Sequence, residues 1–183
     1  MSQAPLPAPA ALIGEIERSI RNVPDFPKPG IQFKDITPVL ADPRLFAASI
    51  ELLTAGHAPG SVKAVAGIDA RGFIFAAAAA HRLGVGFVPI RKRGKLPYQT
   101  VEESYDLEYG SNTIAIHVDA VPAGSRVLLV DDLLATGGTA RAAANLLRRL
   151  GAEVVEIAFL IELGFLNGRE RLSGFPVRSL IRY

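Results

Sequence analysis

Four apolar, β-favouring residues, Val127 to Val130, lead directly into two adjacent carboxylates, Asp131 and Asp132. A short loop rich in Gly and Thr follows, and residues 138–150 have the composition of a helix. This order predicts a buried strand that ends in an acidic pair and turns at once into a helix N-terminus. It favours folds in which strands and helices alternate and in which ligands bind at the carboxyl ends of the strands.

Strands and helices also alternate along the rest of the chain. Asp42-Pro43 is typical of a helix start, and Gly84 is typical of a helix end. Three prolines within 23–30 predict a rigid loop, and the charged stretch 92–104 predicts a long one. Helices are predicted over 11–21, 43–55, 72–83 and 138–150, and strands over 62–67, 86–91, 105–108, 113–118, 127–130 and 153–163. The predicted class is α/β, with a doubly wound, mainly parallel sheet flanked by helices on both faces.

Length and composition set the domain organisation and exclude several functions. We expect residues 1–10, rich in Ala and Pro, to form a flexible tail and 11–183 of the 183 residues to form a single domain. The absence of cysteine excludes disulfides and thiolate metal sites, and the net charge of +2 is too small to indicate a nucleic-acid partner. No apolar run approaches the roughly 20 residues that cross a bilayer, and no secretory signal is visible, so a cytoplasmic protein is predicted.

The segment that follows the acidic pair has the features of a phosphate-binding loop. Small residues let the backbone surround an anion, and the next helix adds free N–H groups and a favourable dipole. Thr136 and Thr139 add hydroxyl donors, while Asp131 and Asp132 can accept hydrogen bonds from ribose hydroxyls or hold Mg²⁺ through water. A tight strand-to-helix turn with an Asp cap would explain an isolated Asp-Asp or Gly-Gly pair equally well. The whole run suits a sugar phosphate better, and it matches neither the Gly-Lys-Ser/Thr nucleotide loop nor the G-x-G-x-x-G dinucleotide fingerprint.

Four blocks of the chain carry a resemblance to a known family: Pro24–Gly30, Gly67–Phe73, Arg91–Pro97 and Val130–Thr139. In order and spacing, over nearly the whole chain, they resemble the type I phosphoribosyltransferases, and among these the purine-salvage members that use adenine. The resemblance implies the type I phosphoribosyltransferase fold, with a small N-terminal hood segment within 11–40 and a flexible loop. It also implies the reaction of adenine with phosphoribosyl diphosphate (PRPP) to give AMP and diphosphate, in a homodimer. Mg²⁺ is the implied cofactor, held mainly through PRPP, diphosphate and water, with Asp131 and Asp132 as candidate ligands.

Two groups of residues are assigned to the phosphates by this resemblance. The phosphate and ribose of PRPP and AMP are assigned to Asp131, Asp132, Ala135, Thr136, Gly137, Gly138 and Thr139. The diphosphate is assigned to Ala70, Arg71, Arg91, Lys92, Lys95 and Tyr109. From composition alone, the cations of 91–95 are equally typical of a solvated surface loop. In the family such a loop closes over the site, with some cations reaching in from the other subunit, and neutralises the leaving group.

Glu108 and Arg71 are the predicted catalytic residues. Substitution at the ribose C1 passes through a cation-like sugar, and the reaction also needs an acid/base group for the proton of the purine. The resemblance assigns Glu108 as the acid/base group beside the purine and Tyr109 to the positioning of ligand and loop. The hexapeptide Tyr105–Gly110 alone would suggest a surface strand carboxylate, but the adjoining basic loop favours the catalytic interpretation.

Adenine is assigned to the block after the proline-rich loop and to Leu133. Phe33 offers a flat face for stacking, Leu133 covers the opposite face, and backbone groups of Gln32 and Lys34 contact the adenine edge. An ordinary core aromatic is the alternative for Phe33. Ala135 stands where relatives that use 6-oxopurines usually carry an Asp, which favours adenine.

Two competing functions remain at this stage. One is a phosphoribosyltransferase for xanthine, guanine or a pyrimidine, against which Ala135 argues. The other is a PRPP-sensing regulator that binds nucleic acid. The first 22 residues are too short for a helix-turn-helix domain, and the nearly balanced charge also argues against a regulator.

Overall fold

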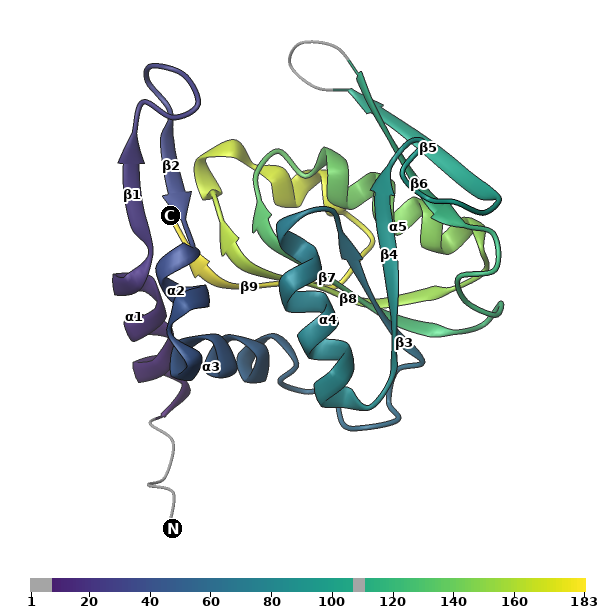
Figure 1. Cartoon of the computed structure of the whole chain (residues 1–183), viewed down its shortest axis with the longest axis horizontal. Coiled ribbons are helices and arrows are strands. Elements are labelled where there is room, and N and C mark those ends of the chain that lie inside the picture. Colours follow the sequence, from purple (N-terminus) through teal and green to yellow (C-terminus); the bar gives the residue numbers. More distant parts are fainter. Residues whose placement is uncertain (1–7, 107–110) are drawn as a thin grey trace. The chain divides into compact units, whose positions relative to one another are not determined.

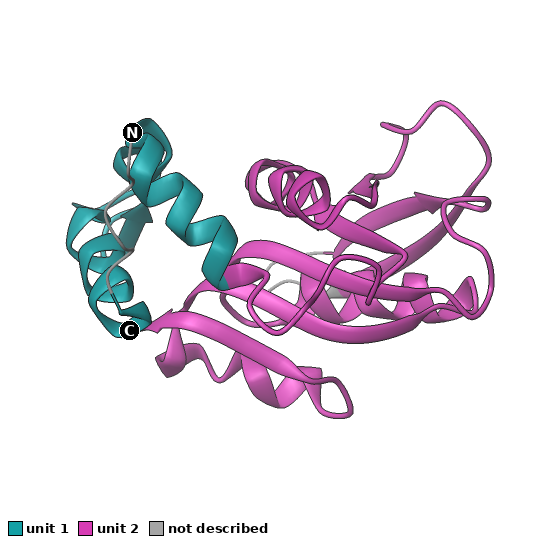
Figure 2. Ribbon diagram, turned by 90° about the horizontal axis from the view of Figure 1, so that it is seen from below, with its two compact units in different colours: residues 1–52 teal, residues 53–183 magenta. Residues whose placement is uncertain are grey.

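The computed structural model describes residues 8–106 and 111–183, and the chain divides into two compact units, Met1–Leu52 and Leu53–Tyr183 (Figure 2). Unit 1 begins with a helix, continues through a two-stranded antiparallel sheet and ends in two helices. In chain order these elements are α1 (Pro9–Ser19), β1 (Arg21–Pro24), β2 (Gln32–Asp35), α2 (Thr37–Ala41) and α3 (Pro43–Leu53). The boundary between the units therefore lies beyond the hood segment predicted for 11–40.

Local sequence signals explain how unit 1 is built. The predicted start of α3 is confirmed, because the Asp42 Oδ1 accepts hydrogen bonds from the backbone N–H groups of Arg44 and Leu45 at 2.8 and 3.0 Å. The loop predicted from residue 23 begins later than expected. Val23 and Pro24 pair with β2 instead, which Pro24 allows because it ends a two-stranded ribbon.

Unit 2 is built on a seven-stranded sheet in the order β5-β6-β4-β3-β7-β8-β9 (Figure 1). Its strands are β3 (Ala64–Ile68), β4 (Gly86–Lys92), β5 (Thr100–Asp106), β6 (Ser111–His117), β7 (Arg126–Leu134), β8 (Glu153–Glu162) and β9 (Val177–Arg182). Its helices are α4 (Arg71–Leu83) and α5 (Gly138–Arg149), with the short 3-10 helices η1 (Gly164–Leu166) and η2 (Gly168–Leu172). The five strands from β4 to β9 in sheet order run parallel, and β5 and β6 form an antiparallel edge.

The direction of the crossovers places the helices. From the central strands, β3–α4–β4 runs toward one edge of the sheet and β7–α5–β8 toward the other. Because such crossovers are right-handed, α4 and α5 cover opposite faces (Figure 1). The apolar residues Val127–Val130 of β7 are fully buried, as strands covered on both faces require. The predicted doubly wound, mainly parallel α/β sheet is confirmed.

One prediction of local structure was wrong, and one strand was not predicted. The stretch 92–104 is not one long loop, because β5 begins at Thr100 and pairs with β6 as far as Asp106. The charged residues of this stretch break the alternation of apolar and polar residues from which a strand is predicted. Glu103 accepts a hydrogen bond from Asn145 at 3.0 Å and pairs with Arg149 at 3.2 Å, so α5 compensates a carboxylate that the strand alone would leave unpaired. The edge strand β9 was also missed.

Membrane-spanning helices were searched for in the described part of the chain. Over 8–106 and 111–183, none of the helices combines the length and the apolar composition that a bilayer crossing requires.

Candidate active site

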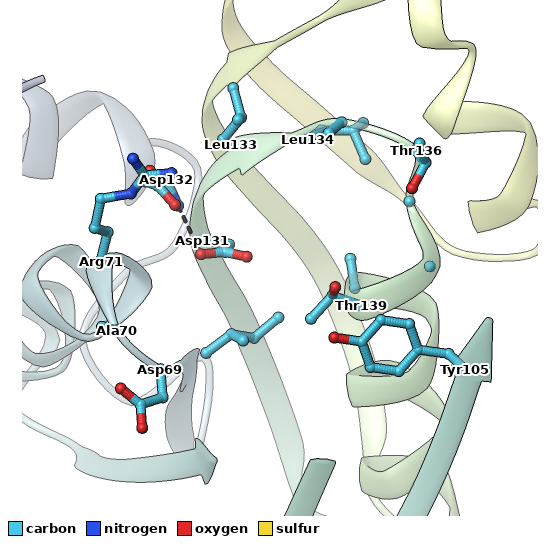
Figure 3. A pocket seen from close by; sticks show the side chains of 15 residues that line it. Asp69, Ala70, Arg71, Tyr105, Asp131, Asp132, Leu133, Leu134, Thr136 and Thr139 are labelled. Carbon is cyan, nitrogen blue, oxygen red and sulfur yellow. Dashed lines mark hydrogen bonds and ion pairs between the residues drawn. The ribbon is translucent and has the colours of Figure 1, made fainter. Parts of the chain in front are cut away.

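A pocket of about 330 Å³ opens at the carboxyl ends of β3 and β7. These neighbouring strands are the two from which the crossovers leave in opposite directions, and ligands of open α/β sheets bind at such a switch point. The pocket is lined by Ile68–Arg71, Tyr105 and Asp131–Ala140 (Figure 3). The predicted acidic pair and the predicted phosphate loop therefore share one pocket with Ala70 and Arg71.

Asp131 and Asp132 lie at the end of β7 and have different partners. The Asp132 side chain is buried and forms an ion pair with Arg71, whose Nε lies 2.7 Å from Oδ2 (Figure 3). The Asp131 Oδ1 accepts a hydrogen bond from the Asp132 backbone N–H at 2.9 Å. A Cβ on Gly72 would meet this same Asp131 oxygen, so only glycine leaves room for the carboxylate there.

The environment of the pair disfavours two negative charges. Burial raises the pKa of Asp131 well above its usual value, and the neighbouring Asp132 charge raises it further. Burial also raises the pKa of Asp132, although Arg71 opposes this shift. A ligand that brings hydroxyl donors or positive charge to these carboxylates relieves that cost, so the pair is suited to a polyhydroxylated ligand.

The loop from Ala135 to Thr139 forms the wall of the pocket that faces the Arg71 side (Figure 3). Gly137 has a φ of +81°, a left-handed conformation that glycine adopts without strain, and it serves as the N-cap of α5. The first intrahelical bond runs from the Arg141 N–H to the Gly137 carbonyl at 2.9 Å. The preceding amides have no partner within the helix and are available to an anion. The hydroxyl groups of Thr139 and Tyr105 point into the same space (Figure 3).

The turn between β3 and α4 connects the pocket to the basic segment 91–95. The Asp69–Ala70 peptide bond is cis, and Arg71 follows at the start of α4. The Asp69 Oδ2 pairs with the Arg91 Nε at 2.9 Å, and the Arg91 Nη1 donates to the Lys95 carbonyl at 3.0 Å. Arg91 thus contacts the turn at Asp69, although it is not among the described residues that line the pocket.

The predicted diphosphate residues are only partly brought together. Ala70 and Arg71 line the pocket, whereas Lys92 and Lys95 are exposed and do not. Tyr109 and the predicted catalytic Glu108 lie outside the described residues, so their roles stay predictions.

The predicted adenine residues fall in both units. Leu133 lines the pocket of unit 2. Gln32, Phe33 and Lys34 form most of β2 in unit 1. There Phe33 is half-buried and meets Phe26 edge-on at 5.1 Å between ring centres, while the Lys34 Nζ donates to the Asn22 Oδ1 at 2.6 Å.

Two polar residues that line the pocket, Asp69 and Tyr105, had no predicted role. Asp69 follows directly after the buried strand β3, so the rule that identified Asp131 could have identified it. Tyr105 reaches the pocket from β5, which begins at Thr100 and not at residue 105 as predicted. Only the full pairing of β5 with β6 would have shown that its ring faces the start of α5.

Comparison with known proteins agrees with this geometry. A family model described as a phosphoribosyl transferase domain matches residues 35–173. An adenine phosphoribosyltransferase from Acidothermus cellulolyticus is 57% identical over 175 residues, covering 95% of this chain and 99% of that protein. The chain belongs to the adenine phosphoribosyltransferase family. The resemblance inferred from the four sequence blocks is confirmed, and the chain is a transferase.

Solved structures extend this similarity to the backbone. The crystal structure of an adenine phosphoribosyltransferase from Thermoanaerobacter pseudethanolicus matches with a TM-score of 0.89 and 53% identity, covering 93% of this chain and 99% of that one. The Saccharomyces cerevisiae enzyme, complexed with an imino-altritol bisphosphate and adenine, matches with a TM-score of 0.86 and 40% identity, covering 93% and 99%.

Proposed function

We propose that the pocket at the ends of β3 and β7 is the active site in which this chain transfers the 5-phosphoribosyl group of PRPP to adenine. The products are AMP and diphosphate, and the reaction belongs to purine salvage. One observation carries the assignment of the site: an acidic pair, an amide-lined loop at a helix N-terminus and the Arg71 turn line a single pocket. A relative that was solved with adenine and a sugar-like bisphosphate supports the choice of ligands.

The 5-phosphate of PRPP binds to the loop Ala135–Thr139. Its charge is met by the free amides at the start of α5 and by the hydroxyls of Thr136 and Thr139. The ribose hydroxyls donate to Asp131 and Asp132, which stabilises the ionised carboxylates. Fixing both ends of the ribose phosphate holds C1 in one orientation for attack.

The diphosphate leaves toward the Arg71 turn. Negative charge develops on it while the ribose ring becomes cation-like, so fixed positive charge beside the leaving group lowers the barrier. Ala70 and Arg71 supply the contacts within the pocket. The family resemblance assigns Arg91, Lys92, Lys95 and Tyr109 to the same diphosphate, and closure of the basic loop would bring its cations to the site.

The adenine contacts are assigned to Leu133 in unit 2 and, in unit 1, to the Phe33 ring and the backbone groups of Gln32 and Lys34. Glu108 acts as the acid/base group for the purine proton while the purine nitrogen attacks C1 of the ribose. Ala135 presents a methyl group where a carboxylate would favour a 6-oxopurine, so adenine is the preferred base.

The donor set fits magnesium that arrives with its substrate. Within 8–106 and 111–183, no three His, Cys, Asp or Glu side chains are grouped as a metal site. Mg²⁺ is commonly bound through one or two carboxylates together with substrate phosphates and water, and Asp131 and Asp132 offer that pair. When bound, the ion neutralises phosphate charge and supports departure of the diphosphate.

The organisation of the chain follows the same family pattern. We infer one catalytic domain over 11–183 that includes a purine-binding hood within 11–40, and a cytoplasmic homodimer without nucleic-acid or membrane partners. Partner-subunit cations from the 91–95 segment would then contribute to each site. The tail predicted over 1–10 does not include Pro9 and Ala10, because α1 begins at Pro9.

A purine assay with PRPP and Mg²⁺, followed by absorbance, tests the function. We expect turnover of adenine well above that of hypoxanthine or guanine, loss of most activity in Glu108→Ala, and full activity in the matched control Glu153→Ala at the far end of β8. Turnover of hypoxanthine without turnover of adenine would overturn the choice of base. Unchanged activity in Glu108→Ala would remove Glu108 from catalysis.

A further inference from the structure

A buried carboxylate lies directly behind the phosphate loop, in a position that the proposed reaction does not use. Glu162 ends β8 with a relative exposure of 3%, and it pairs in register with Leu134, the residue before the loop. Its Oε2 lies 2.5 Å from the Arg169 Nη2 and accepts a hydrogen bond from the Ser179 Oγ at 2.7 Å. These contacts lower the pKa of Glu162, chiefly through the Arg169 hydrogen bonds, so the group is a carboxylate at neutral pH.

Arg169 is held in place from several directions. Its Nε donates to the Glu162 Oε1 at 3.3 Å, and its Nη1 donates to the Val177 carbonyl at 2.8 Å. The Nη2 also reaches the Ser179 Oγ at 3.1 Å. A guanidinium with several fixed acceptors has one orientation, so Arg169 fixes the start of η2 relative to β8 and β9.

The backbone next to Arg169 touches the phosphate loop. A Cβ on Gly168 would meet the Ala135 carbonyl oxygen and would lie 2.9 Å from the Gly137 nitrogen. A Cβ on Gly137 would in turn meet the Gly168 carbonyl oxygen. The contact is therefore backbone against backbone, with no side chain that could adjust, and a shift of Gly168 must shift the loop.

The far end of η2 is tied to the same helix that the loop begins. The Arg141 Nη1, in the first turns of α5, donates to the carbonyls of Arg171 and Ser173 at 3.3 and 3.0 Å. The segment 168–173 thus supports both the loop and the start of α5.

We propose that Glu162 and Arg169 are positioning residues for the 5-phosphate site. They hold Gly168 against Ala135 and Gly137, and so keep the loop amides aimed at the phosphate. Neither side chain lines the pocket, so their effect on the substrate is indirect. The proposal rests on the proposed function, because it assumes that the loop binds the phosphate of PRPP.

The chain contains a matched control on the same two strands. Glu156 of β8 and Arg178 of β9 also form a partly buried pair, with Oε2 and Nη2 2.8 Å apart. Glu156 also contacts His57, and the Arg178 Nη2 also donates to the Leu53 carbonyl; both of these partners lie outside the loop and η2. Removing Arg178 therefore costs an equivalent ion pair without releasing Gly168.

Comparing Arg169→Met with Arg178→Met separates positioning from general stability. In Arg169→Met we expect the KM for PRPP and the Kd for ribose 5-phosphate by calorimetry to rise about tenfold to 100-fold, because a small displacement of binding groups has effects of that size. The KM for adenine should change less than twofold. Arg178→Met should lower the melting temperature by about as much as Arg169→Met does. It should keep the wild-type KM for PRPP and the wild-type Kd for ribose 5-phosphate.

Two further variants cover a failure to fold and the charge of the pair. Arg169→Lys and Glu162→Gln keep part of the hydrogen bonding, and we expect each to raise the Kd for ribose 5-phosphate by roughly threefold to tenfold. Equal effects of Arg169→Met and Arg178→Met on this Kd, or no effect of any variant at residues 162 and 169, would overturn the proposal.

A loop variant distinguishes this outcome from failure of the proposed function. Thr139→Val removes a hydroxyl from the pocket wall itself, so it should weaken ribose 5-phosphate binding whatever the role of Arg169. If Thr139→Val weakens binding and Arg169→Met does not, only the positioning role is wrong. If wild-type protein fails to bind ribose 5-phosphate, the phosphate site itself is wrong.

Discussion

The two turns that form the pocket begin alike and achieve their charge balance differently. Each follows a buried parallel strand, starts with an aspartate and enters a helix, β3 into α4 and β7 into α5. In the β7 turn, Asp131 and Asp132 crowd two carboxylates together, and burial raises the pKa of both. In the β3 turn, Asp69 is paired with Arg91, 22 positions along the chain, at 2.9 Å. The carboxylates of the β7 turn are destabilised by burial, and a ligand could remove that cost. The carboxylate of the β3 turn is already paired with a cation from a distant segment.

Replacing Asp131 should have the largest effect on activity and should stabilise the fold. Asp131→Asn keeps an oxygen for the Asp132 N–H but cannot accept the ribose hydroxyls as a carboxylate. We expect kcat/KM for PRPP to fall about 10²- to 10³-fold, the cost of losing an oriented electrostatic contact. Steady-state kinetics with PRPP varied measure this loss, and a decrease below threefold would contradict the assignment.

The pH dependence of stability tests the same carboxylate independently. Because the pKa of Asp131 is raised in the folded chain, the unfolded chain releases this proton at lower pH. The wild type therefore loses stability relative to Asp131→Asn as pH rises from about 4 through the raised pKa. Melting temperatures should be similar near pH 4 and should favour Asp131→Asn at pH 7. If the melting temperatures of the two proteins change with pH in parallel, burial does not destabilise the ionised Asp131 carboxylate.

Replacing Arg71 should lower both activity and stability. Arg71→Met removes the proposed contact to the diphosphate and leaves the Asp132 carboxylate, 6% exposed, without its 2.7 Å partner. We expect kcat/KM for PRPP to fall about 100-fold. The free energy of unfolding should fall by about 1–2 kcal/mol, less than for a fully buried pair because Arg71 is partly exposed. Chemical denaturation measures the second effect, and a rise in stability, as in Asp131→Asn, would erase the distinction between the two residues.

The same contrast explains what could be predicted from the sequence. The β7 turn is contiguous from Val127 to Thr139, so its strand, its acidic pair and its Gly- and Thr-rich loop could all be recognised. The pairing of Asp69 with Arg91 and the contact of Gly168 with Gly137 join distant segments, and no local pattern predicts them. The start of β5 was predicted five residues too late because Glu103 is compensated by Arg149, a partner that is 46 positions away. β9 was missed for a related reason: Arg178 within it pairs with Glu156 of β8, which is 22 positions away.

Replacing Asp69 should have a moderate effect that is confined to the leaving-group side. Asp69→Asn can still accept a hydrogen bond from Arg91 but no longer neutralises it, so the 91–95 segment should be held less firmly. We expect the KM for PRPP to rise roughly threefold to tenfold while the Kd for ribose 5-phosphate stays unchanged. Glu153→Gln, which removes a carboxylate from the exposed Arg126 pair, is the control. If Asp69→Asn weakens ribose 5-phosphate binding as well, the two turns do not act separately.

Removing Lys95 should have the smallest effect and the strongest dependence on salt. Its side chain is exposed, so its attraction for a polyanion is screened by mobile ions until the segment closes. Lys95→Ala should raise the KM for PRPP or slow turnover by about twofold to fivefold at low ionic strength, and by less at 0.5 M salt. Lys63→Ala removes another exposed cation, which lies just before the opposite end of β3, so it corrects for the change in net charge. Equal kinetics for Lys95→Ala and Lys63→Ala at every salt concentration would remove Lys95 from the diphosphate site. The β3 turn would then depend on Arg71 and Arg91 for its positive charge.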